Sequence, residues 1–330
     1  MVTALNTALR DAMREDPSVH VLGEDVGLLG GVFRVTDGLV GEFGEQRCWD
    51  TPLAESGILG TAVGMAMYGL RPVVEMQFDA FAYPAFEQLV SHVAKMRNRT
   101  RGTLPLPITV RIPYGGRIGG VEHHSDSSEA YYAHTPGLHV VAPATVADAY
   151  GMLREAIGSD DPVVFLEPKH SYWSRDTWTP DRPAPVAATG TAQVRRTGRD
   201  AVLITYGSAL DVCEEAADAA REQGLDLGIV DLRSLVPFDD ATVAEAVRST
   251  GRAVVVHDAS GFGGFGAEVT ARVTESCFYH LEAPVLRVTG LDLPHPPPLL
   301  EHHHLPNADR VLAAVRRLMT PEGTASSARF

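Results

Sequence analysis

The sequence predicts an α/β protein of two domains, each with a mainly parallel sheet flanked by helices. The chain has 330 residues, which is more than one hydrophobic core usually organises. Short continuous apolar runs alternate with helical stretches, as expected of parallel strands that helices cover on both faces. A segment rich in proline and charge interrupts this alternation near the middle of the chain, and it predicts a linker.

The first 180 residues predict one of these domains. Apolar residues recur at helical spacing from Leu5 to Met13, so an amphipathic helix is expected there, and Pro17 ends it. Further helices are expected over residues 58–69, 85–97 and 146–157. Strands are expected over residues 19–22, 73–76, 108–112, 139–142 and 163–166.

A second alternating series follows the expected linker, which covers residues 181–198. Residues 199–320 predict the second domain, and residues 321–330 predict a flexible tail. Within this domain, strands are expected over residues 201–207, 227–231, 253–257 and 284–288. Helices are expected over residues 209–223, 240–249, 266–276 and 307–319.

Composition excludes several classes of protein. The net charge of −14 argues against a nucleic-acid partner or an anionic membrane, because both require a positive surface. No apolar run reaches the roughly 18 residues that a membrane helix needs, and the N-terminal residues lack the pattern of a secretion signal. Cys48, Cys213 and Cys277 are odd in number and widely spaced, which fits a reducing cytoplasm rather than a disulfide scaffold.

The first segment with candidate functional residues has a carboxylate just before an apolar helix that contains glycines. Glu55 stands just before this helix, where exposed backbone N–H groups favour a negative charge. Gly57, Gly60 and Gly64 would let another backbone or a flat ligand approach closely. The residues by themselves allow a second interpretation, in which Glu55 is a helix cap and the glycines are packing contacts.

Aromatic residues and histidines mark two further segments. An apolar strand runs into a loop with Gln77 and Phe81, whose ring suits either a stacking platform or the core. Four glycines between residues 115 and 120 then lead to His123 and His124. Adjacent histidines do not easily bind one metal ion, so general acid–base chemistry is the better functional hypothesis. Glu301 and the three histidines after it predict a solvated loop.

In this order and spacing, the segments resemble the beta subunits of 2-oxo acid dehydrogenases, which belong to the transketolase-like superfamily of thiamin enzymes. The resemblance covers nearly the whole chain. It implies a transketolase-like pyrimidine-binding domain followed by a transketolase C-terminal-like domain. The matching stretches include GEDVG, DTPLAESGI, VEMQFDAFAYPAFEQ, PGLHVVAPAT and VDLRSLVPFD.

The resemblance also implies roles for individual residues. Glu55 would face N1′ of the aminopyrimidine of thiamin diphosphate, Phe81 would lie against that ring, and Gln77 would lie nearby. His124 would manage protons while the acyl group passes to lipoamide. Many relatives have His-Ser-Gln-Ser where this chain has Asp126 two residues after His124. Asp126 is expected either to raise the basicity of His124 or to face solvent.

The resemblance also implies that two metal ions are bound. The family tends to hold potassium with loop carbonyls, which would here belong to Ile108, Ala156, Ser159 and Asp161. The superfamily binds Mg²⁺ and diphosphate with a Gly-Asp-Gly motif, which this sequence lacks. We therefore expect an alpha subunit to hold Mg²⁺ and the diphosphate, in an α2β2 heterotetramer whose cofactor sites lie between chains.

The leading hypothesis is the beta subunit of a branched-chain 2-oxo acid dehydrogenase, active only with its alpha subunit and docked to a lipoyl acyltransferase core. One alternative is a pyruvate or acetoin dehydrogenase beta subunit. A self-sufficient transketolase-like enzyme would need the diphosphate motif that is absent. A non-catalytic assembly subunit is a further alternative, against which the joint presence of Glu55, Phe81 and His124 argues.

Overall fold

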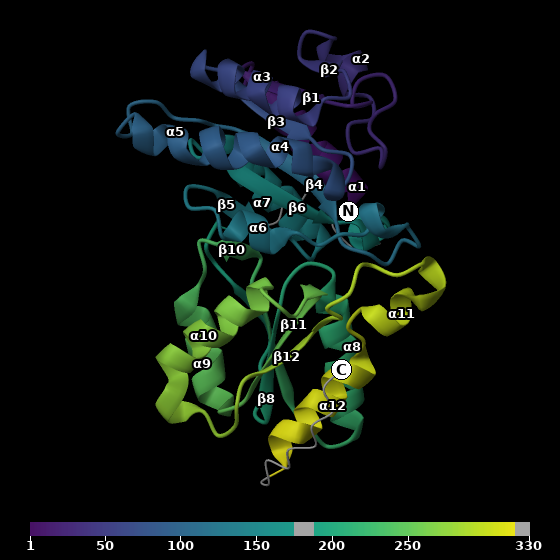
Figure 1. The fold of residues 1–330 in the computed structure, drawn as a ribbon, viewed down its shortest axis with the longest axis vertical. Helices are drawn as coiled ribbons and strands as arrows, with labels where there is room; N and C mark the ends of the chain where they lie inside the picture. The colour runs from purple at the N-terminus through teal and green to yellow at the C-terminus, as the bar shows by residue number, and fades with distance from the viewer. Residues whose placement is uncertain (175–187, 321–330) are drawn as a thin grey trace.

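Two sheets with helices on both faces form the chain, one above the other in Figure 1. The structure is a computed structural model, and it describes residues 1–174 and 188–320. Residues 181–187 of the expected linker and the expected tail, 321–330, lie outside the described residues. The predicted fold class, two α/β domains with mainly parallel sheets, is confirmed.

The first sheet has seven strands in the order β10-β5-β6-β4-β3-β1-β2. Neighbouring strands run parallel except β10, which is antiparallel to β5. The carboxyl ends of the six parallel strands therefore lie at one edge of the sheet. The strands are β1 (Val19–Gly23), β2 (Cys48–Asp50), β3 (Arg71–Glu75), β4 (Thr109–Tyr114), β5 (His139–Val141), β6 (Val163–Pro168) and β10 (Ser234–Val236).

Helices cover this sheet on both faces because its strand residues are apolar on both sides. One face packs against α1 and α7, and the other packs against α3 and the helical segment that follows β3. This last segment was expected as one helix, but it contains a π-helical turn, Leu89–Val93, between α4 and α5. The helices are α1 (Val2–Glu15), α2 (Leu39–Phe43), α3 (Glu55–Met67), α4 (Tyr83–Gln88), α5 (Ala94–Arg99), α6 (Glu129–Ala133) and α7 (Val146–Gly158).

The second sheet has five strands in the order β12-β11-β8-β9-β7, with β7 antiparallel at one edge. Helices α9 and α10 cover one face, and α8 and α12 cover the other. The strands are β7 (Gln193–Arg196), β8 (Ala201–Thr205), β9 (Leu227–Asp231), β11 (Ala253–Ser260) and β12 (Leu286–Gly290). The helices are α8 (Ala209–Glu222), α9 (Asp240–Thr250), α10 (Phe265–Cys277), α11 (Glu301–His304) and α12 (Ala308–Met319).

Local sequence explains where three of the long helices begin. Thr145 precedes α7 and its hydroxyl accepts a hydrogen bond from the Asp148 N–H at 3.1 Å. Asp239 caps α9 and Asn307 caps α12 in the same way. Such caps satisfy backbone donors that the helix itself leaves free, so these residues fix the helix starts.

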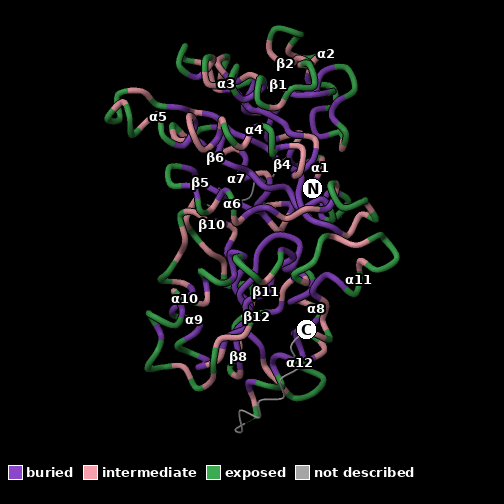
Figure 2. The backbone as a smooth tube through the Cα atoms, viewed as in Figure 1, coloured by how far each residue is buried: buried purple, intermediate pink, exposed green. Residues whose placement is uncertain are grey.

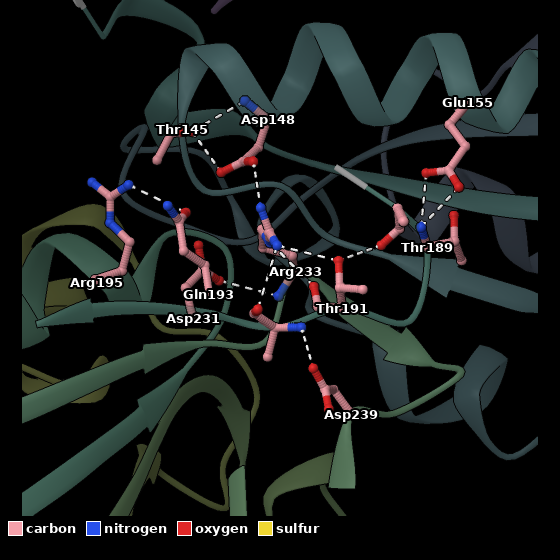
Figure 3. Close-up of polar contacts among 12 residues, drawn as sticks. Thr145, Asp148, Glu155, Thr189, Thr191, Gln193, Arg195, Asp231, Arg233 and Asp239 are labelled. Carbon is pink, nitrogen blue, oxygen red and sulfur yellow. Dashed lines mark hydrogen bonds and ion pairs between the residues drawn. The ribbon is translucent and has the colours of Figure 1, made fainter. Parts of the chain in front are cut away.

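The two domains share a continuous core and a polar junction. One cluster of buried apolar residues includes side chains from both sheets. Figure 2 shows buried segments in both domains and where they meet. Arg233, just before β10, donates to Asp148 of α7 at 3.0 Å and to the Thr191 carbonyl at 3.2 Å (Figure 3). The Thr189 N–H donates to Glu155, also on α7. Residues inside the expected linker and residues after it therefore both contact the first domain.

Three short strands were not expected from the sequence. They are β2, β7 and β10. Strand β7 lies inside the segment expected as linker. Strand β10 lies in the second half of the chain but joins the first sheet. Among the described residues, no helix is both long and apolar enough to cross a membrane.

Candidate active site

Candidate site residues follow the parallel strands of the first sheet, at the edge where these strands end. Because those carboxyl ends lie at one edge, residues that are far apart in sequence meet there, which is the usual position of ligand sites in open α/β sheets. They follow β1 (Glu24), β2 (Glu55), β3 (Gln77, Phe78 and Phe81), β4 (His124) and β6 (Lys169).

Helix α3 begins at Glu55, three residues earlier than expected, and the side chain of Glu55 is half-buried. Glu24, after β1, is buried, and its Oε1 has no hydrogen-bond partner among the described residues. Burial raises the pKa of Glu24, and the charges of Glu55 and Asp25 raise it further. The two glutamates therefore interact at the start of α3, although sequence analysis had not singled out Glu24.

Gln77 connects the ends of β1 and β3. Its Nε2 donates to Oδ2 of Asp25 at 2.9 Å. Asp25 has a positive φ of 58°, a conformation that aspartate tolerates better than most residues. Gln77 is half-buried, and its hydrogen-bond partner Asp25 directly follows Glu24 in the sequence.

Phe81 and His124 lie together, as the sequence-based site requires. Their ring centroids are 5.3 Å apart in an edge-to-face arrangement. Phe78, which is buried, contacts both rings, at 5.4 Å from Phe81 and 4.3 Å from His124. Phe81 also stacks on His123 at 6.0 Å. Phe81 is only half-buried, so it is not a core residue, and its ring is available to a planar ligand.

His124 is a half-buried histidine with an unpaired ring nitrogen. Its Nδ1 is buried and has no partner among the described residues. Burial lowers the pKa of His124, and the neighbouring His123 and Lys169 lower it further. The imidazole is therefore neutral near pH 7 and is able both to accept and to donate a proton.

Asp126 makes its side-chain hydrogen bond to Tyr83. Its Oδ2 accepts from the Tyr83 hydroxyl at 2.8 Å, and the residue is half-buried. This bond ties the loop that follows His124 to the start of α4. Both roles expected of Asp126 stay predictions, since the lowered pKa of His124 comes from burial, His123 and Lys169.

Sequence analysis missed Lys169 and Asp79, which are buried close to His124. Asp79 accepts hydrogen bonds from the Ser128 N–H at 2.8 Å and the Ser128 hydroxyl at 2.6 Å, and burial raises its pKa to about 6. Lys169 is fully buried, and its Nζ lies 5.9 Å from the centre of the Phe78 ring. The only signal in the sequence was the position of Lys169 directly after an apolar strand.

A buried group of three charges supports the sheet beneath this site. Arg111 on β4 donates to both oxygens of Glu167 on β6, at 2.6 and 2.8 Å, and to Glu75 on β3. All three side chains are at most 5% exposed. The Tyr172 hydroxyl also donates to Glu167, at 2.6 Å. Every charge in this group is therefore paired, which is what burial of a charge requires.

The second domain holds the glycine-rich loop that leads to His124. Glu301 accepts hydrogen bonds from the Arg117 N–H at 2.5 Å and from His295 at 3.1 Å. Arg117 also pairs with Asp258 at 3.2 Å. The prediction of a solvated loop here is wrong for part of the segment, since it forms the short helix α11 and His304 is buried.

The four carbonyl oxygens of the expected potassium site each accept a hydrogen bond from the protein. The guanidinium of Arg71 donates to one of them, that of Ser159. Because a carbonyl oxygen has a second lone pair, these contacts leave the potassium site a prediction. The donors are Val163 N to Ile108 O at 2.9 Å, Ser159 N to Ala156 O at 3.2 Å, Arg71 Nη1 to Ser159 O at 2.8 Å, and Ser159 Oγ to Asp161 O at 3.0 Å.

Other metals find no ready site in the part of the chain that the structure describes. No group of three or more histidine, cysteine, aspartate or glutamate side chains is arranged to hold an ion there. His123 and His124 lie next to each other with ring centroids 4.4 Å apart, but no third ligand joins them.

Family comparisons define the class of protein that this fold and site belong to. Residues 1–174 match the family described as "Transketolase, pyrimidine binding domain", and residues 190–311 match "Transketolase, C-terminal domain". The first match ends beyond β6 and contains Glu55, Gln77, Phe81 and His124. The chain is thus a transketolase-type protein.

Similarity to curated proteins identifies the family within this class. The chain is 53% identical to a pyruvate dehydrogenase E1 component subunit beta of Leifsonia xyli subsp. xyli, over 96% of this chain and 94% of that protein. It is 52% identical to a 3-methyl-2-oxobutanoate dehydrogenase subunit beta of Mycobacterium tuberculosis, over 97% and 91%. It is 42% identical to a 2-oxoisovalerate dehydrogenase subunit beta of Bacillus subtilis, over 96% and 97%. The chain belongs to the family of E1 beta subunits of 2-oxo acid dehydrogenases.

A solved structure agrees with the fold. A chain described as a split gene transketolase, inactive beta4 tetramer, matches with a TM-score of 0.78 over 96% of this chain and 97% of that chain. The two sequences are 23% identical, so this likeness concerns the fold alone.

Proposed function

We propose that the chain supplies the pyrimidine side of a thiamin diphosphate site in a 2-oxo acid decarboxylase. The observation that carries the proposal is that Glu55, Phe81 and His124 follow strands whose carboxyl ends lie at one sheet edge, where the rings of Phe81 and His124 are in contact. When bound, thiamin diphosphate supplies the electron sink for decarboxylation of a 2-oxo acid. The half-buried carboxylate, the half-buried phenyl ring and the unpaired imidazole nitrogen fit the aromatic half of this cofactor.

Each of these residues has a distinct task in the proposal. Glu55 would share a proton with a ring nitrogen of the aminopyrimidine, favoured by its place at a helix N-terminus. Phe81 would pack against the ring, and Gln77 would border it. His124, neutral near pH 7, would take up and return protons while the acyl group passes to lipoamide.

The site is open on this chain, which supports a shared site. On α3, residues next to Glu55 such as Ser56, Gly57 and Gly60 are exposed, and Leu53 before the helix is 79% exposed. The described residues also offer no cluster for Mg²⁺. In our proposal an alpha subunit covers this face in an α2β2 heterotetramer and holds Mg²⁺ and the diphosphate. The assembly would work in the cytoplasm with a lipoyl acyltransferase core.

Isolated chains are expected to bind thiamin diphosphate at least about 100-fold more weakly than the reassembled heterotetramer, a difference of about 2.7 kcal/mol. The reason is that the charged half of the cofactor finds no metal and no donor set on this chain. Titration calorimetry with and without Mg²⁺ and the alpha subunit measures this difference. Tight, Mg²⁺-dependent binding by the chain alone would contradict the shared site.

The substrate we propose is a branched-chain 2-oxo acid. Relatives named for 3-methyl-2-oxobutanoate and for 2-oxoisovalerate, at 52% and 42% identity, support it. Pyruvate is the second candidate, since the relative at 53% identity is named for pyruvate. Decarboxylation rates of 3-methyl-2-oxobutanoate and pyruvate, measured with the alpha subunit present, decide between them. Absence of turnover with both acids would refute the proposed function.

A further inference from the structure

Lys169 is a buried cation without a partner. It is 0% exposed, and its Nζ has no hydrogen-bond acceptor among the described residues. The sequence contains only two lysines, and the other, Lys95, is exposed on α5. Lys169 directly follows β6, so its backbone lies at the edge of the sheet where the candidate site is.

The acidic residues whose charges act on Lys169 are bonded elsewhere. Asp79 accepts from the backbone and hydroxyl of Ser128, and Asp126 accepts from Tyr83. Burial lowers the pKa of Lys169 to about 8, against the opposing charges of Asp79, Asp126 and Glu301. The Nζ atom also lies 5.9 Å from the centre of the Phe78 ring, whose face only partly replaces lost hydration.

Arg111 shows how this protein accommodates a cation that has only a structural role. Its guanidinium is equally buried, but Glu75 and Glu167 pair with it and Tyr172 completes the group. An unpaired buried charge destabilises a fold, whereas a paired one is tolerated. Because Arg111 is paired within the fold and Lys169 is not, we expect the hydrogen-bond acceptor of Lys169 to belong to a bound molecule.

Other unpaired polar atoms lie on the same side of the sheet. His124 Nδ1 and Ser125 Oγ are both buried without partners. The His124 ring contacts Phe78, over which Lys169 lies. A cation, a hydroxyl and a neutral imidazole together suit a small anion with several acceptor oxygens.

We infer that Lys169 Nζ binds the carboxylate of the 2-oxo acid substrate. This inference rests on the proposed function, and it adds the group that recognises the substrate's charge. A carboxylate accepts charge-assisted hydrogen bonds, so it offsets the charge that the fold leaves unpaired. The uncharged amide of the same acid would leave Lys169 uncompensated and would bind more weakly.

The test compares Lys169→Met with the native chain, both reassembled with the alpha subunit and cofactor. The probes are 3-methylbutanoate, which lacks the reactive oxo group, and its uncharged amide, with dissociation constants from calorimetry. We expect native enzyme to prefer the carboxylate by tenfold or more, and the variant to bind both probes alike. We also expect the melting temperature of the variant to be unchanged or higher. Lys95→Met, which removes the exposed lysine, should keep the native preference.

Two results would overturn the inference. One is a variant that keeps the native preference for the carboxylate. The other is a native enzyme that turns over a 2-oxo acid but does not distinguish the two probes. If Lys169→Met fails to fold, Lys169→Gln, which keeps an N–H donor without the charge, gives the same comparison. Native turnover, measured first, separates failure of this inference from failure of the proposed function.

Discussion

Replacing Glu55 with glutamine is expected to lower kcat of the reassembled heterotetramer by about 100- to 10,000-fold, the range that one positioned acid–base group contributes. Glutamine has nearly the same shape but cannot share the proton of a ring nitrogen as a carboxylate does. Because Glu55 is only half-buried, the substitution leaves α3 and the core intact. Steady-state decarboxylation with saturating cofactor measures the loss, and size-exclusion chromatography measures assembly.

Glu45→Gln is the matched control, since Glu45 is exposed in the loop after α2. It should leave kcat unchanged. Unchanged turnover in Glu55→Gln would contradict the proposed acid–base role and would favour a non-catalytic assembly subunit. Loss of assembly together with activity would show that Glu55 has a structural role instead.

Replacing Arg111 with methionine is expected to destabilise the protein by about 3–5 kcal/mol, as measured for broken buried ion pairs. The substitution leaves Glu75 and Glu167 buried next to each other without their shared cation. Both would have to take up a proton or be hydrated for the fold to survive. Urea denaturation followed by circular dichroism gives the change in free energy of unfolding.

Arg97→Met provides the comparison for this effect. Arg97 pairs with Asp161 at 2.5 Å, but both side chains are more than one-third exposed, so its loss should cost no more than about 1 kcal/mol. The triple variant Arg111→Met, Glu75→Leu, Glu167→Leu should recover most of the stability, because it leaves no unpaired charge. Equal effects of Arg97→Met and Arg111→Met would refute this account of the buried group.

Most of the fold could be predicted from the sequence, because the spacing of apolar residues follows from which side chains are buried. All five strands expected in the first half appear at nearly the expected residues, since each is a continuous apolar run. Strands β2, β7 and β10 were missed because they have only three or four residues and lie at or next to sheet edges. Whether such a segment pairs depends on a neighbouring strand that is remote in sequence, which a local pattern does not contain.

Candidate site residues could be predicted only where they belong to a recognisable sequence motif. Glu55, Gln77, Phe81 and His124 were found through the resemblance, and the structure places Gln77 by Asp25 and Phe81 by His124. Lys169 was not found, because lysine is normally exposed and no sequence pattern reveals an unpaired one. The potassium site stays a prediction, because a hydrogen bond to a loop carbonyl, such as that from Arg71 to Ser159, leaves the oxygen a second lone pair.

Strand β10 has a consequence for how this protein could be recombined with its relatives. The two halves are not independent modules, because three residues that follow the second domain's β9 form the outer strand beside β5. A chimera joined between residues 174 and 188 would take that strand and Arg233 from the foreign parent. If the fit is poor, β5 would present free N–H and C=O groups to other chains, a known route to aggregation. A productive exchange would therefore have to move β10 together with the first domain.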